Sequence, residues 1–137
     1  MTSDTPLSDL LIDKLRDRFA DRAFDLGDPP EARIRFPAEH PDVGDVEIFD
    51  DVEELTVTLG KFTHTHIGNY DEGISDEEHA DRITESVILL LRALFSDQLV
   101  LWGSQAGGGG YYLLAPNGPF PPDVRKYVWS GPFVEGE

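Results

Sequence analysis

The segment 75–95 constrains the fold more than any other part of the sequence. Ser75 followed three residues later by Glu78 forms a capping box, which is a start signal for a helix. Apolar residues then recur at helical spacing, and further apolar residues widen their stripe: Ala80, Ile83, Val87, Ile88, Leu90, Leu91, Leu94 and Phe95. A helix that is apolar nearly all round is covered on more than one side. We therefore predict a central helix over 75–95, with Leu91 buried and Leu89 projecting from the polar face.

The other elements follow from alternating apolar and polar residues, which predict strands. Before the central helix, strands are expected at 32–36, 46–48 and 55–59, the last continuing to Ile67 across a β-bulge at Gly60. After it, strands are expected at 99–102, 111–115 and, less clearly marked, 124–129. Runs of strands separated by helices favour an antiparallel sheet in an α+β domain. We predict one domain over 1–137, frayed at 1–5 and 134–137, with helices packed on a single sheet that includes 55–67 and 98–102.

A first helix is predicted from Thr5 and Pro6, a capping hydroxyl followed by proline, to about Phe24. Five aspartates spaced four apart would form a stripe along it, and three basic residues lie at i,i+3 spacing from them: Asp9, Asp13, Asp17, Asp21, Asp25, Lys14, Arg18 and Arg22. Such a stripe resembles a row of phosphates and could face a basic partner. Local ion pairs along the helix favour a solvated face instead.

Composition excludes several classes of function. The 137 residues contain no cysteine, which rules out disulfides, thiol nucleophiles and cysteine-ligated metal. A net charge of −16 opposes binding to nucleic acid or to anionic lipid. No apolar run approaches the length of a membrane span, and the acidic start is unlike a signal peptide, so a cytoplasmic location is expected. Many aspartates with few lysines fit either adaptation to high salt, in a bacterial or archaeal protein, or a surface for a basic partner.

The pair His64 and His66 is the most suggestive short motif. Residues two apart on a strand share a face, so both imidazoles would point the same way. Such a pair holds a divalent ion when a carboxylate or a third histidine completes the site. The candidates for that third ligand are Asp71, Glu72, His79 and His40. Because none stands at a diagnostic spacing, we expect a surface or hydrogen-bonded pair with no stoichiometric transition metal and no cofactor, and a metal or catalytic role is the alternative.

Two further kinds of chemistry have weaker support. General acid–base catalysis would pair His64 or His66 with Asp71 or Glu72. The glycine-rich segment 103–110 lacks the lysine and hydroxyl residue of a phosphate loop and precedes a strand, so a hairpin loop is expected there. Neither pattern predicts a specific reaction.

The last third of the chain is nearly neutral and rich in aromatic residues. Residues 98–137 carry three acids and two bases, whereas residues 1–60 carry sixteen acids and six bases. Since an acidic patch repels a copy of itself, we expect any homodimer to form through the aromatic region. The predicted interface consists of Leu89, Trp102, Tyr112, Tyr127 and Trp129. Packing of the same aromatics into a small satellite core is the alternative.

This layout, a small acidic α+β domain without a catalytic signature, is similar to that of toxin-neutralising immunity proteins. The resemblance implies an inhibitory protein–protein role and assigns no residue to it. The sequence thus favours a non-enzymatic interaction domain that binds a protein partner. The alternative is a metal-assisted enzyme or small-ligand-binding protein that uses His64 and His66.

Overall fold

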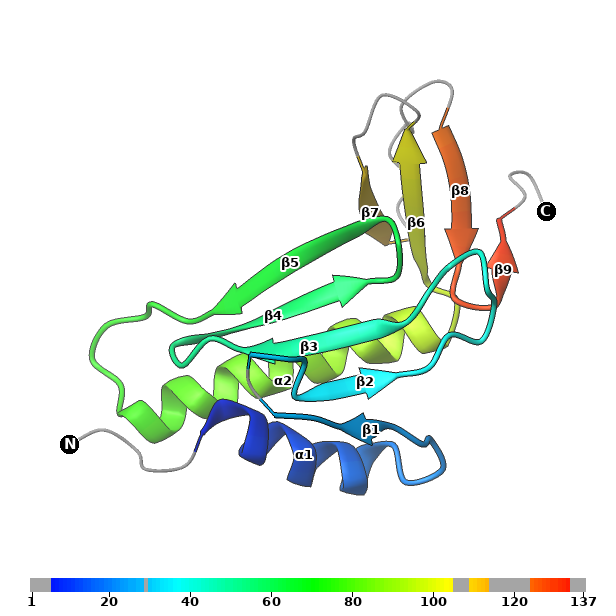
Figure 1. Cartoon of the computed structure of the whole chain (residues 1–137). Helices are drawn as coiled ribbons and strands as arrows, with labels where there is room; N and C mark the ends of the chain where they lie inside the picture. The colour runs from blue at the N-terminus through cyan, green and yellow to red at the C-terminus, as the bar shows by residue number, and fades with distance from the viewer. Residues whose placement is uncertain (1–5, 29, 105–108, 114–123, 134–137) are drawn as a thin grey trace.

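The computed structural model describes residues 6–28, 30–104, 109–113 and 124–133. These described residues form two helices and two sheets, arranged as in Figure 1. Along the chain the elements are α1 (Leu7–Arg18), β1 (Asp25–Leu26), β2 (Ile34–Phe36), β3 (Val46–Asp50), β4 (Glu54–Leu59), β5 (Thr63–Gly68), α2 (Asp76–Phe95), β6 (Leu99–Ser104), β7 (Gly109–Leu113), β8 (Val124–Val128) and β9 (Gly131–Pro132). The predicted α+β class and order of elements are confirmed, with β1 and β9 as short additions and the strand predicted over 55–67 divided into β4 and β5. The expected fraying at 1–5 and 134–137 lies outside the described residues.

Strands β1 to β5 form an antiparallel sheet in chain order, and both helices lie on one of its faces (Figure 1). Burial alternates along β4, where Leu55, Val57 and Leu59 face the helices with no exposed surface. The intervening Thr56 and Thr58 point to the opposite face, which neither described helix covers. The core is therefore built mainly from one face of this sheet and the apolar stripes of α1 and α2, and Leu99, Leu101 and Trp129 complete it.

The predicted β-bulge at Gly60 is wrong, because the chain reverses there. Leu59 pairs with Thr63 across the turn, so β4 and β5 form a hairpin. Gly60 has a φ of +61°, and a Cβ at this position would lie 2.0 Å from the carbonyl oxygen of Val43. Alternation changes phase at Gly60 because the residues of the turn contribute no strand pairing.

The predicted single sheet is also wrong, because β6 belongs to a second one. This sheet has the order β7-β6-β8-β9 and stands near the end of α2 (Figure 1). Phe62, in the β4–β5 turn, connects the two sheets, since its ring lies 5.3 Å from that of Tyr127. The sequence indicates which residues of a strand are buried but not which strand is its partner.

Helix α1 is shorter than predicted. It ends at Arg18, so Asp21 and Asp25 do not extend the aspartate stripe, and Asp25 pairs instead with Arg35 of β2. The expected cap Thr5 lies outside the described residues, and Pro6 occupies the N-cap position.

The predicted i,i+3 ion pairs of α1 do not form. Lys14 and Arg18 instead bind Glu85 of α2, and Arg22 lies over the ring of Phe95 at 3.9 Å. Tertiary packing thus directs these cations towards α2.

Helix α2 agrees with its prediction. The hydroxyl of Ser75 accepts a hydrogen bond of 3.1 Å from the backbone N–H of Glu78. Leu91 is fully buried and Leu89 is 62% exposed.

Neither described helix combines the length and the apolar content that crossing a membrane requires.

Candidate ligand-binding site

Two acidic segments meet at the end of the large sheet where α2 begins (Figure 1). One is the β3–β4 turn, residues 50–54, which contains four carboxylates, and the other is residues 69–79, which contains five. Neither segment contains a lysine or an arginine. The fold therefore concentrates negative charge at this end of the molecule.

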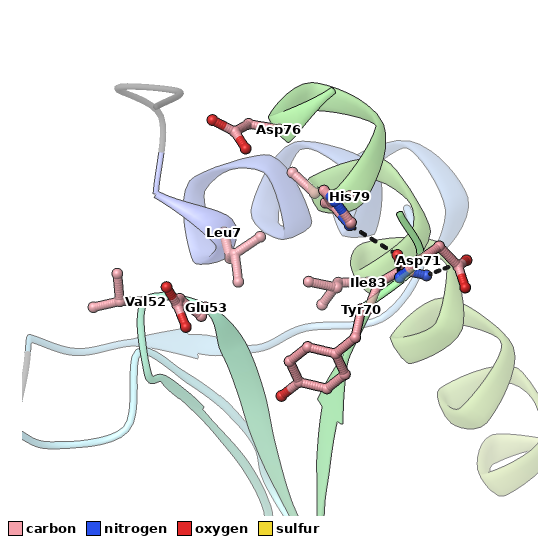
Figure 2. Close-up of a pocket in the computed structure, with 10 residues that line it drawn as sticks. Leu7, Val52, Glu53, Tyr70, Asp71, Asp76, His79 and Ile83 are labelled. Carbon is pink, nitrogen blue, oxygen red and sulfur yellow. Dashed lines mark hydrogen bonds between the residues drawn. The ribbon is translucent and has the colours of Figure 1, made fainter. Parts of the chain in front are cut away.

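A pocket of about 460 Å³ lies between these two segments (Figure 2). The described residues that line it are Leu7, Val52, Glu53, Asn69, Tyr70, Asp71, Asp76, His79, Ala80 and Ile83. Leu7 and Ile83 are buried core residues at 7% and 3% exposure, so they form an apolar floor. The Tyr70 ring is 75% exposed and offers an aromatic face beside that floor. The pocket can thus accept a ligand side chain that has an apolar stem and a polar end.

The rim is acidic. Glu53 comes from the β3–β4 turn and Asp76 from the first turn of α2 (Figure 2). Among the described residues, neither carboxylate forms an ion pair. The third rim carboxylate, Asp71, binds Arg82 at 2.7 Å. Within the part of the chain that the structure describes, two carboxylates therefore line the pocket without a cation.

The β5–α2 loop is held to the helix by side-chain hydrogen bonds. The Asn69 Oδ1 lies 2.8 Å from His79 Nδ1, and because this oxygen only accepts, His79 Nδ1 carries the proton. The Asn69 amide donates to Asp71 Oδ2 at 3.1 Å. Hydrogen bonds from Asn69 and then Arg82 lower the pKa of Asp71 below its ordinary value. His79 thus positions the loop that forms one wall of the pocket.

The predicted pair His64 and His66 does share a face of β5, with ring centroids 5.2 Å apart. His66 Nδ1 lies 2.8 Å from the hydroxyl of Thr56, its cross-strand partner, and 3.6 Å from Glu54 Oε1. The other Glu54 oxygen, Oε2, accepts a hydrogen bond of 2.9 Å from the Tyr70 hydroxyl, which raises the pKa of Tyr70. Tyr70 therefore links Glu54 and His66 to the pocket, which its ring lines.

The other candidate ligands lie apart from this pair. The structure brings Asp71 and His79 together through Asn69 and leaves Glu72 exposed. His40 lies near Tyr127, with ring centroids 6.3 Å apart. Sequence reasoning missed Asp51, Glu53 and Glu54 as members of the site. Their approach to His66 and to the pocket depends on the β3–β4 and β4–β5 registers. The sequence feature that points to them is the run of acidic residues at 50–54.

The predicted interface residues differ in exposure. Trp129 is 1% exposed and packs against Phe95 in the core, so it is not a surface anchor of the single chain. Trp102 and Tyr127 are half-buried, and Leu89 is exposed. The side chain of Tyr112 lies outside the described parts of the structure. Self-association stays a prediction, and among its described residues Leu89 is the most accessible apolar one.

Comparison of the chain with protein-family models, curated proteins and solved structures found no match. The function is therefore inferred from the geometry and charge of this site.

Proposed function

We propose that this protein is a non-enzymatic interaction module that binds a basic protein partner by accepting a lysine or arginine side chain in the pocket. The observation that carries the proposal is the apolar floor, Leu7 and Ile83, beside the carboxylates of Glu53 and Asp76, which form no ion pair with any residue that the structure describes. An immunity-like, inhibitory role is one form that such binding can take.

A basic side chain has the two chemical parts that this pocket complements. Its methylene stem gains from contact with apolar surface, while its cationic head stays at the polar rim. The exposed ring of Tyr70 adds an aromatic face on which a cation is attracted by about 0.5–1 kcal/mol. An uncharged side chain of the same length would gain only the contact of the stem.

The wider charge distribution supports the same partner. The acidic segments 50–54 and 69–79 carry nine carboxylates at the end of the molecule that holds the pocket, and a field of one sign steers an oppositely charged partner towards it. Nucleic acid and anionic membranes would be repelled by the same field.

The experiment is an NMR titration of isotopically labelled protein with the blocked tripeptide Gly-Lys-Gly and with its norleucine analogue. We expect the lysine peptide to shift the resonances of Leu7, Ala80 and Ile83, and the norleucine peptide to bind about tenfold more weakly, a difference of 1.4 kcal/mol. Equal binding of the two peptides would contradict the proposal.

A matched pair of variants separates the pocket from general acidity. Glu53→Gln/Asp76→Asn removes two charges from the rim, and Asp13→Asn/Asp28→Asn removes two from exposed positions elsewhere. Only the rim variant is expected to weaken the lysine peptide. Equal weakening by both would assign the binding to diffuse charge.

A further inference from the structure

The side chains of Asp51, Glu54 and His66 converge on the face of the large sheet that the described helices leave uncovered. Each offers one ligand atom, and these three atoms lie within 4.8 Å of one another. We infer that they form a binding site for a first-row divalent cation such as Zn²⁺ or Mn²⁺. The inference is independent of the proposed function.

The sheet register creates this convergence. His66 lies opposite Thr56, and Glu54 lies opposite Gly68, so Glu54 and His66 are diagonal neighbours on one face. Asp51 is brought back by the tight β3–β4 turn, in which its backbone N–H donates to the carbonyl of Glu54 at 3.0 Å. Backbone hydrogen bonds of β4, β5 and the β3–β4 turn therefore fix the relative positions of the three ligands.

Charge also favours a cation at this point. The Asp51 and Glu54 carboxylates are close together, and among the described residues no lysine or arginine forms an ion pair with either. Like charges at this separation disfavour each other, and a divalent cation between them removes that cost. One imidazole nitrogen with two carboxylate oxygens is a donor set that suits zinc or manganese and leaves positions open for water.

Neighbouring groups orient two of the ligands. The Tyr70 hydroxyl binds Glu54 Oε2, which leaves Oε1 beside His66. The Thr56 hydroxyl contacts both Asp51 and His66 Nδ1. Metal binding through Nδ1 requires the tautomer of His66 that is protonated at Nε2, with Thr56 donating to Asp51 alone. The Tyr70 and Thr56 contacts thus orient Glu54 and Asp51, whereas His66 Nδ1 gives up its contact with Thr56 when it binds a metal ion.

The sequence-based expectation of no stoichiometric metal depended on the missing third ligand. Asp51 and Glu54 supply two carboxylates that residue spacing did not reveal. His64 stands beside His66 on the same face and is not one of the three converging ligands.

Calorimetric titration of metal-stripped protein with ZnCl₂, and separately with MnCl₂, tests this site at neutral pH and near-physiological salt. We expect one site per chain, weakened at least ~10-fold by Glu54→Gln and by His66→Ala. Glu47→Gln is the matched control, because Glu47 lies on the same sheet face and loses the same charge; His40→Ala is the histidine control. Both controls should bind as the wild type does.

Thermal unfolding of each variant without metal shows whether it remains folded, and the ring resonances of His66 report direct ligation. A shift of the His66 resonances at one metal equivalent supports the inference. The absence of a saturable site for either metal, or equal weakening by all four variants, would overturn it. In the second case the binding would reflect diffuse attraction to an acidic surface.

Discussion

The Oδ2 atom of Asp50 accepts hydrogen bonds from both the backbone nitrogen and the hydroxyl of Ser8, at 3.0 and 2.7 Å. Ser8 is in the first turn of α1, where backbone N–H groups lack partners within the helix. A carboxylate from β3 thus caps a helix that is 42 residues away in the chain. The contact also holds the start of α1 beside the β3–β4 turn, where Leu7 forms the pocket floor.

Asp50→Ala is therefore expected to lower the free energy of unfolding by about 1–2 kcal/mol, since it leaves a capping position and the buried Ser8 hydroxyl without an acceptor. Chemical denaturation measures the change. Asp42→Ala, at an exposed position, should change stability by less than about 0.5 kcal/mol. A loss at Asp50 no larger than that at Asp42 would show that the cap contributes nothing.

The two helices are joined by a salt-bridge cluster around Glu85. Lys14 lies 2.8 Å from it, and Arg18 binds both of its oxygens at 3.1 Å. Hydrogen bonds from Lys14 and Arg18 lower the pKa of Glu85 in the folded state. A depressed pKa contributes stability above the pKa of the unfolded chain, and this contribution is lost as pH falls through the folded pKa.

Because Glu85 is about one-third exposed, Glu85→Gln is expected to cost only about 0.5–1 kcal/mol at neutral pH. The difference from the wild type should disappear as the pH falls below about 4. Denaturation curves at a series of pH values provide the measurement. A difference that persists unchanged into the acid range would rule out this ionic contribution.

The central position of α2 is tested by two leucines on the same helix. Leu91→Ala should cost about 2–5 kcal/mol, because Leu91 is fully buried. Leu89→Ala should cost less than about 0.5 kcal/mol, because Leu89 is 62% exposed. Equal losses, measured by denaturant unfolding, would be incompatible with this orientation of α2.

Self-association is predicted through the aromatic C-terminal third of the chain, with the exposed Leu89 as a further contact. Sedimentation equilibrium should show a dimer that Leu89→Ser weakens. A monomer at every concentration would refute the dimer. A dimer that forms only at high salt would instead implicate the acidic faces, whose repulsion salt screens.

Local patterns predicted the parts of the fold that depend on local chemistry. The Ser75 capping box, the buried stripe of α2 and the alternation in β4 follow from neighbouring residues, and the structure agrees with each. The errors concern long-range partners. Gly60 marks a hairpin turn rather than a bulge, and β6 joins a second sheet, because alternation does not identify the neighbouring strand.

The candidate site was only partly predictable for the same reason. The shared face of His64 and His66 follows from strand geometry. The approach of Glu54 to His66 depends on the β4–β5 register, and the pocket depends on how α2 starts beside the β3–β4 turn. The prediction of a five-aspartate stripe with local ion pairs was wrong, because α1 ends at Arg18 and its cations Lys14 and Arg18 bind Glu85 of α2.

The central claim is that the pocket itself, rather than the overall negative charge, receives a basic side chain. The most direct test is the dissociation constant of the Gly-Lys-Gly peptide for Ala80→Phe, which fills the pocket and leaves every charge in place. Ala23→Phe, at an exposed position outside this pocket, is the control, and unfolding curves confirm that both variants fold. We predict that Ala80→Phe weakens the peptide about tenfold, equivalent to 1.4 kcal/mol, while Ala23→Phe does not. Unchanged binding to Ala80→Phe would contradict the account.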